Sequence, residues 1–164
     1  MNMMMIRIAT TGDFEQIWHF FKPIAEASET YAFDREVSKD KAFDIWMTLP
    51  NRTYVYEKDG EILGSYYLKT NQSGGGSHVC NCGYMVSESA RAQGVAAKMC
   101  DHSQQVAREL GYLAMQFNFV VKTNDGAIRL QQKLGFDIVG RLPKAFNHLK
   151  QGLVDALVMY KWLN

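Results

Sequence analysis

The segment ARAQGVAAKM, residues 90–99, combines residue types that can hold a bulky anion. Arg91 lies three positions before Gly94, and the small residue Ala96 lies two positions after it. A glycine-containing turn that opens a helix leaves backbone N–H groups unpaired, with the positive end of the helix dipole behind them. Because Gly94 and Ala96 carry little or no side chain, a phosphate can approach the backbone closely. The segment predicts a phosphate-binding turn, but it matches neither the dinucleotide fingerprint nor the P-loop and is weak evidence alone.

A strand, a helix and a second strand must position this turn. The segment HVCNCGYMV, residues 78–86, is typical of a central strand, and it runs through residues 87–94 into a long helix closed by Gly111. Four residues mark the apolar face of this helix: Val95, Met99, Val106 and Leu110. Residues 112–121 then predict the next strand. This order indicates a βαβ unit with a parallel strand pair.

The first half of the chain predicts two helices and antiparallel strands. In order, we expect a strand at residues 5–10, a helix at 13–27, a second helix at 37–49 ended by Pro50, and a hairpin within 52–69. Asp59-Gly60 is the turn of that hairpin. The glycine-rich segment at 71–77 is not followed by Gly-Lys-Ser/Thr, so we interpret it as a flexible loop rather than a phosphate cradle.

The last part of the chain predicts one helix and two strands. Asn124-Asp125-Gly126 could form a hairpin turn, but the apolar spacing after it and Gly135 as a stop favour a helix over 123–135. Strands at 136–141 and 153–163 follow. The predicted fold class is α/β (α+β), with a mixed, mostly antiparallel sheet and about four helices.

Length and composition narrow the class of protein. A chain of 164 residues, 47% hydrophobic, is long enough for one domain with a sizeable core, which we place at residues 1–164. The formal net charge is +1 and the basic residues are scattered, which argues against nucleic-acid binding. The start, MNMMMI, has neither a basic region nor a sustained apolar stretch, and no run of about 18 apolar residues occurs. We expect a cytoplasmic protein that does not enter membranes.

The cysteines favour buried, reduced thiols. Cys80, Cys82 and Cys100 are odd in number and lack the paired CxxC clusters of a zinc site, so no metal site is predicted. Cys80 and Cys82 share one face of their strand, but no base that could make a thiolate is evident. Direct transfer to an acceptor is therefore preferred over a cysteine-bound intermediate.

At these motifs the chain resembles the GCN5-related N-acetyltransferase (GNAT) superfamily. Arg91, Gly94 and Ala96 match its acyl-CoA loop, Q/R-x-x-G-x-G/A. Its second signature, N-x-x-A followed by G-F, is matched by Asn124, Ala127, Gly135 and Phe136. The resemblance covers nearly the whole chain and implies that the fourth and fifth strands splay apart, with the pantetheine arm pairing with the fourth strand.

The resemblance also implies which residues hold acetyl-CoA, the expected cosubstrate. Met85 and Val86 would offer backbone groups to the pantetheine arm, and Asn124 would reach the cosubstrate from the next helix. The pyrophosphate would lie on residues 91–96, which are Arg91, Ala92, Gln93, Gly94, Val95 and Ala96.

One position departs from the family pattern. Many relatives have a tyrosine seven residues after the motif asparagine, which protonates the departing CoA thiolate, whereas this chain has Gln131. Glutamine cannot give up a proton. The loss is modest, because a thiol of pKa about 8.5 leaves as thiolate at pH 7 at a cost of only about 2 kcal/mol. Gln131 keeps open the alternative of a non-catalytic acyl-CoA sensor.

The acceptor site is predicted around Asn81 and Asn118. A lone asparagine in a strand is more often a buried amide that satisfies its neighbours, but here one lies on each of the two strands expected to diverge. We therefore assign both to catalysis. The segments HVCNCG, FNFV and TN also resemble acetyltransferases that act on toxic amino acids such as proline analogues.

Other candidates are more often structural or surface residues. They are His78, His148, Glu88, Tyr160 and the aromatic group Trp18, Phe20, Phe21 and Tyr31. The hypothesis is an acetyl-CoA-dependent N-acetyltransferase that acts by direct attack of a small amine, an amino acid or an analogue. A sensor, an enzyme acting on protein N-termini or lysines, and a homodimer all stay open.

Overall fold

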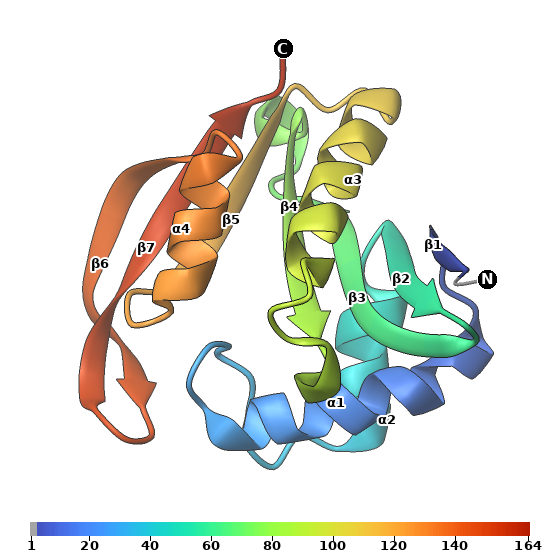
Figure 1. Cartoon of the computed structure of the whole chain (residues 1–164). Coiled ribbons are helices and arrows are strands. Elements are labelled where there is room, and N and C mark those ends of the chain that lie inside the picture. The colour runs from blue at the N-terminus through green and yellow to red at the C-terminus, as the bar shows by residue number, and fades with distance from the viewer. Residues whose placement is uncertain (1–2) are drawn as a thin grey trace.

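The computed structural model describes residues 3–164. The strands in this part of the chain form a seven-stranded sheet in the order β1-β2-β3-β4-β5-β7-β6 (Figure 1). Only β4 and β5 are parallel; the other neighbours are antiparallel. The strands are β1 (Met4–Ile8), β2 (Arg52–Lys58), β3 (Glu61–Thr70), β4 (Val79–Val86), β5 (Ala114–Val121), β6 (Asp137–His148) and β7 (Gly152–Trp162). The predicted mixed, mostly antiparallel sheet is confirmed. The first two residues of MNMMMI lie outside the described part of the chain.

Helices cover both faces of the sheet (Figure 1). Within the described residues the α-helices are α1 (Phe14–Ala27), α2 (Lys39–Phe43), α3 (Val95–Glu109) and α4 (Asp125–Lys133), as many as predicted. The side chains of α1 and α2 pack with Val55 and Met85 on one face. Those of α3 pack with Tyr66 and Phe117 on the other. None of the helices in residues 3–164 has the length and apolar character needed to cross a bilayer.

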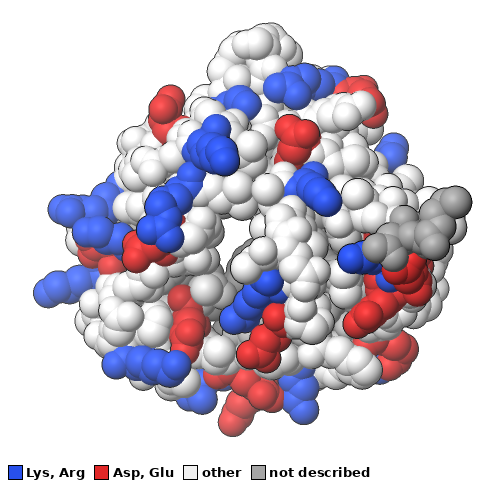
Figure 2. All heavy atoms as spheres, in the orientation of Figure 1, with Lys and Arg blue, Asp and Glu red and all other residues white. Residues whose placement is uncertain are grey.

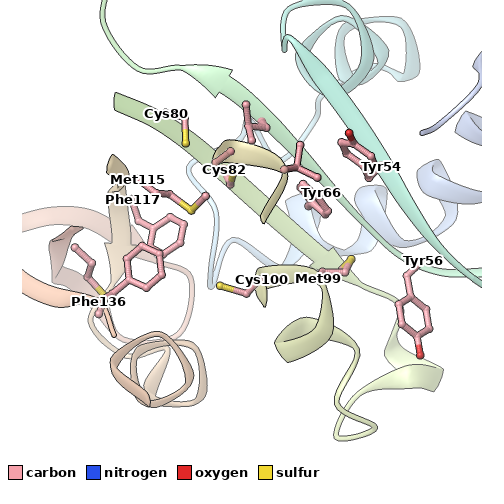
Figure 3. Close-up of a cluster of buried hydrophobic side chains, with 14 of the residues drawn as sticks. Tyr54, Tyr56, Tyr66, Cys80, Cys82, Met99, Cys100, Met115, Phe117 and Phe136 are labelled. Atoms are coloured by element: carbon pink, nitrogen blue, oxygen red, sulfur yellow. The ribbon is translucent and has the colours of Figure 1, made fainter. Parts of the chain in front are cut away.

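The two faces carry separate hydrophobic cores. On the α3 face, sulfur-containing and aromatic side chains from β3, β4, β5 and α3 pack together (Figure 3). The three cysteines belong to this core, and all are buried and unbonded, as predicted. On the other face, Phe21 and Trp46 are fully buried and meet edge to face, with ring centroids 5.8 Å apart. Each core fixes the position of β4 from one side.

The parallel strands pair only where they begin. Val79 lies opposite Ala114 and Cys80 opposite Met115, and no further pair follows. Beyond this point β4 and β5 diverge, as their ribbons show (Figure 1). The Asn81 side-chain amide donates to the carbonyl oxygen of Gln116 at 2.9 Å, which links the strands just past their last backbone pair. The predicted splay is thus present. Beyond Cys80, the edge of β4 that faces β5 has no strand paired with it.

Two elements differ from the sequence-based expectation. The predicted second helix begins as α2 and continues as a π-helical turn at Asp44–Thr48. Strand β6 extends seven residues beyond the predicted end at Arg141, across a register shift between Leu142 and Phe146. At this bulge the backbone N–H of Lys144 donates to the Asp155 side chain at 2.9 Å, which keeps β6 attached to β7.

The predicted apolar face of α3 is correct except at its end. Val95, Met99 and Val106 are buried. Leu110 is 40% exposed, because it caps the helix and no longer follows the helical repeat.

Candidate active site

A cavity of about 1110 Å³ lies in the fork between β4 and β5. Its walls come from both faces of the sheet: α1 and the loop after it on one side, the start of α3 and α4 on the other. In the space-filling view the molecule is hollowed at the centre, with charged side chains of both signs nearby (Figure 2). The fork is therefore a passage in which two reactants can meet from opposite faces of the sheet.

The start of α3 supplies free backbone donors at one end of the cavity. Gly94 is the N-cap residue in the left-handed conformation, with φ of 78°, and no side chain caps the helix. A Cβ at Gly94 would meet no atom within 4 Å, so the space over the turn is open. The unpaired N–H groups of the first turn can bind an anion there. The side chains of Arg91 and Ala96 line the cavity.

The remaining residues of the predicted phosphate turn contribute differently. Ala92 and Gln93 are exposed, and the Gln93 amide donates to the carbonyl oxygen of Ser89 at 3.0 Å, which braces the turn. The Val95 side chain is buried in the core, so only its backbone N–H is available to an anion. The turn can thus bind an anion through its backbone, and the Arg91 side chain offers a cation nearby.

The unpaired edge of β4 forms the middle of the cavity wall. Met85 and Val86 both line the cavity, and the Met85 side chain packs into the core on the α1 face. The backbone N–H of Tyr84 donates to the Tyr31 hydroxyl at 2.8 Å, and that hydroxyl donates to the carbonyl oxygen of Tyr84. The structure thereby places Tyr31, from the loop after α1, against the strand edge.

Helix α4 closes the cavity from the β5 side. Asn124 caps this helix by accepting a hydrogen bond from the Ala127 N–H at 3.4 Å, and it lines the cavity. About two turns further along α4, Gln131 lines the cavity too. Its side-chain carbonyl oxygen is buried and has no hydrogen-bond partner within residues 3–164. An unpaired buried acceptor costs about 1–3 kcal/mol, so a ligand that donates to it is favoured.

Asn81 and Asn118 belong to one hydrogen-bond network, which passes through the backbone and the side chain of Gln116. The Tyr67 hydroxyl donates to Asn81 at 3.3 Å, and Asn81 donates to the backbone of Gln116 at 2.9 Å. The Gln116 amide donates to Asn118 at 2.8 Å, and Asn118 donates to Asn71 at 2.7 Å. Asn81 is 6% exposed and Asn118 is exposed, but both line the cavity. The structure brings the predicted pair together across the fork.

Sequence reasoning missed two residues beside this hydrogen-bond network. Tyr67 and Lys69 line the cavity, and the Lys69 ammonium lies 5.3 Å from the centre of the Tyr67 ring. Lys69 forms no ion pair within the described chain. Their alternation in β3 was a usable signal, since Tyr67, Lys69 and Asn81, which lies opposite Lys69 in β4, share one face of the sheet.

The histidine candidates lie away from the cavity. His78 is exposed just before β4 and contacts Trp162. His148 is buried at the end of β6, where its ring nitrogen accepts hydrogen bonds from the N–H groups of Lys150 and Gln151. Neither residue lines the cavity, so neither is placed to act as a base there.

The other candidates divide between cavity and core. Glu88 lines the cavity but is exposed, and Tyr160 on β7 does not line it. Phe20 and Tyr31 line the cavity, whereas Phe21 is fully buried in the core. Trp18 packs against the same core.

Two thiols reach the cavity but are poor nucleophiles. Cys82 and Cys100 line it. Burial raises the pKa of the Cys82 thiol well above its usual value, and the neighbouring Cys80 adds to this shift. Burial likewise raises the pKa of Cys100 to about 11. Both thiols are therefore protonated near neutral pH.

Residues 14–136 match the model of the acetyltransferase (GNAT) family. The chain belongs to this family. It is therefore an N-acetyltransferase whose cosubstrate is acetyl-CoA. Among solved structures, a GCN5-related N-acetyltransferase from Kribbella flavida is 39% identical, covers 97% of each chain and superposes with a TM-score of 0.92. The N-acetyltransferase aca1 of Schizosaccharomyces pombe is 29% identical over 85% of this chain and 75% of its own length.

A more distant solved structure shares the fold. The yncA protein of Salmonella typhimurium, solved with its cofactor acetyl-CoA, is 22% identical, covers 99% of this chain and 95% of its own, and has a TM-score of 0.85. The cavity of the present chain fits such a cosubstrate. It offers an uncapped helix start for a pyrophosphate, an unpaired strand edge for an extended arm, and an unpaired acceptor at Gln131.

Proposed function

We propose that this acetyltransferase transfers the acetyl group directly to a small amine, an amino acid or an amino-acid analogue. The observation that carries the proposal is the polar wall of the fork formed by Lys69, Asn81 and Asn118. An ammonium without an anionic partner within residues 3–164 suits a carboxylate on the acceptor, and the amides suit its amine.

The cosubstrate is proposed to lie along the free edge of β4. The backbone of Met85 and Val86 would pair with the pantetheine arm, as an added strand would. The N–H groups of residues 91–96 would hold the pyrophosphate, with Arg91 adding its charge. Asn124 and Gln131 would contact the arm from α4. Acetyl-CoA supplies the activated acetyl group.

Catalysis is proposed to come from positioning and from oxyanion stabilisation. The fork holds amine and thioester together, and backbone N–H groups of β4 stabilise the tetrahedral oxyanion. The acceptor must lose a proton before it attacks: an α-amino group with the peptide pKa of about 7.7–8.0 becomes neutral at pH 7 at a cost of about 1–1.4 kcal/mol. The amino group of a free amino acid is more basic, so its deprotonation costs more, and solvent water takes the proton. The protonated state of Cys82 and Cys100 supports direct attack over a cysteine-bound intermediate.

A panel of amines tests this proposal by thiol release from acetyl-CoA. We expect turnover with free α-amino acids, slower turnover with the matching amides that lack the carboxylate, and none with peptides. Turnover of peptides but not of free amino acids would instead identify a protein-modifying enzyme. Binding of acetyl-CoA with no turnover of any amine would identify a sensor.

The domain organisation, the cellular location and the oligomeric state of the enzyme are also proposals. We infer one domain over residues 1–164, because the described sheet runs from β1 to β7 without a break in strand pairing. A cytoplasmic location is supported by the buried, unbonded cysteines, which suit a reducing compartment. A homodimer stays a prediction, which sedimentation equilibrium checks.

A further inference from the structure

The loop between α1 and α2 places one hydroxyl group on the reactive edge of the fork. Tyr31 accepts a hydrogen bond from the backbone N–H of Tyr84 at 2.8 Å and donates one to the carbonyl oxygen of the same residue. A residue of a strand directs its N–H and C=O to the same side. Here that side is the fork, where β5 has already separated from β4. The hydroxyl therefore occupies the place that the neighbouring strand leaves vacant.

The ring of Tyr31 is held from the α1 side. It stacks on Phe33 with centroids 5.2 Å apart and an interplanar angle of 8°, and Phe33 stacks on the buried Phe21 at 5.0 Å. This aromatic stack aims the hydroxyl at β4. Because the stack does not depend on the hydroxyl, Tyr31→Phe removes one oxygen atom and keeps the packing.

The surroundings keep the phenol protonated. Burial raises the pKa of Tyr31 far above its usual value, with a smaller contribution from nearby Tyr67. Tyr31 is therefore a hydrogen-bond donor throughout the neutral range and is not a base.

We propose that Tyr31 is a catalytic residue that donates a hydrogen bond to the thioester carbonyl oxygen. The inference rests on the proposed acetyl transfer through this fork. When the thioester carbonyl takes the Tyr84 N–H, the Tyr31 hydroxyl turns from the Tyr84 peptide to the same oxygen. The amine nitrogen then bonds to the carbonyl carbon, and the C=O electron pair moves onto the oxygen between the two donors. As that pair returns, the C–S bond breaks, CoA leaves as thiolate, and the nitrogen of the new amide releases its extra proton to solvent water. Tyr31 keeps its proton.

Kinetics of Tyr31→Phe test the proposal with the best amine from the panel. We expect kcat to fall about 10²-fold, as for loss of one oxyanion donor. The acceptor KM should change less than about threefold, because the hydroxyl contacts the thioester and not the amine. Tyr112→Phe is the matched control: its hydroxyl bonds Thr70 and lies outside the cavity lining. This control should keep the wild-type kcat.

Calorimetry gives a second measurement that needs no acceptor. Acetyl-CoA is compared with S-ethyl-CoA, a thioether that lacks the carbonyl oxygen. If the Tyr31 hydroxyl contacts that oxygen, Tyr31→Phe lowers the preference for acetyl-CoA over S-ethyl-CoA about two- to tenfold, as expected for one hydrogen bond. A general loss of folding would weaken both ligands equally.

The two measurements separate this proposal from the proposed function. A wild-type kcat in Tyr31→Phe overturns the role of Tyr31 while leaving the acetyltransferase assignment intact. If the wild-type protein acetylates no amine, the proposed function fails. The ligand preference then decides about Tyr31, and an unchanged preference in Tyr31→Phe overturns its contact with the carbonyl.

Discussion

At the scale of single residues, Asn81 and Asn118 lie in one hydrogen-bond network, but their side chains differ in how easily they can change partners. Asn81 is buried, and both ends of its amide are occupied by Tyr67 and by the Gln116 backbone. Asn118 is exposed and bonds to other side chains. Side chains can exchange partners when a ligand arrives, whereas the Asn81 link holds the base of the fork together.

We therefore expect the two alanine variants to differ. Asn118→Ala should raise the acceptor KM with little change in acetyl-CoA affinity, because it removes the contact that we propose with the acceptor. Asn81→Ala should lower kcat and also lower the free energy of unfolding by about 1–3 kcal/mol, since buried partners lose their hydrogen bonds. Initial rates and urea denaturation measure both effects. Asn147→Ala, at an exposed position of β6, is the control. Wild-type kinetics in both variants would make the two amides purely structural.

Gln131 gives a second prediction at this scale. Gln131→Ala should slow turnover less than tenfold, well short of the 10²-fold or more typical of a lost general acid. Gln131→Tyr should give a partial gain in kcat. Thiol-release assays measure both. A large loss in the alanine variant with unchanged acetyl-CoA affinity would contradict the view that CoA leaves as thiolate without an acid.

At the scale of elements, the start of α3 is the part most open to a direct test. Gly94→Val places a branched side chain over the free N–H groups at a left-handed residue, at a strain of about 1–2 kcal/mol. Acetyl-CoA at a hundred times its dissociation constant should stabilise the unmodified protein by about 2.7 kcal/mol. The variant should lose most of that stabilisation, as thermal melting with and without ligand will show.

A matched control separates the anion site from backbone strain. Gly111, just after α3, also has a positive φ, of 91°, and a Cβ there would likewise meet no atom within 4 Å. Gly111→Val should lower the melting temperature and keep the response to acetyl-CoA. An unmodified protein whose melting ignores acetyl-CoA would contradict the proposed site as a whole.

The packing of α3 on β3 makes the free energy of unfolding depend on pH. Partial burial lowers the pKa of His102 below its usual 6.5, and its ring nitrogen is hydrogen-bonded to the Tyr66 hydroxyl at 2.8 Å. Because the unfolded chain then binds the proton more readily, the free energy of unfolding should fall as pH drops below about 6.5. His102→Gln should be less sensitive between pH 7.5 and 5 in urea denaturation. Equal sensitivity in both proteins would show that other groups cause the acid loss.

Elements that follow a local repeat could be predicted, and those that depend on distant partners could not. The turn before α3 and the helix α4 could be predicted, because glycine positions and apolar spacing are local signals in the sequence. The extension of β6 was not, since it depends on Asp155 of β7 capturing the Lys144 N–H across a bulge. The contact of Tyr31 with Tyr84 joins residues 53 apart in the chain, and no short pattern indicates it.

The same limit applies to the candidate site. The cosubstrate residues form a motif with fixed spacing, so they could be assigned by resemblance. The proposed acceptor wall could be predicted only in part. Asn81 and Asn118 are polar residues within strands, which is unusual enough to notice, whereas Lys69 is a charged residue near the end of β3, where such residues are ordinary. Its meaning depends on the absence of an acidic partner among the described residues, which becomes visible only in three dimensions.

At the scale of the whole molecule, the fork is held by contacts far from its base. The tip of the β6–β7 hairpin touches the loop after α1, where the Leu149 N–H donates to the Ser28 carbonyl at 3.2 Å. Next to it, Lys150 forms an ion pair with Glu29 at 2.9 Å. Glu29 lines the cavity, so this contact forms part of the rim.

Because the cavity has walls from both faces of the sheet, both reactants can be bound at once, and no product must leave before the second reactant arrives. Initial rates at several fixed concentrations of each should therefore give double-reciprocal lines that intersect, the signature of a ternary complex. Radiolabelled CoA should not exchange into acetyl-CoA when the amine is omitted. Parallel lines together with such exchange would mean that the acetyl group rests on the protein between two half-reactions, which a passage open to both partners makes unnecessary.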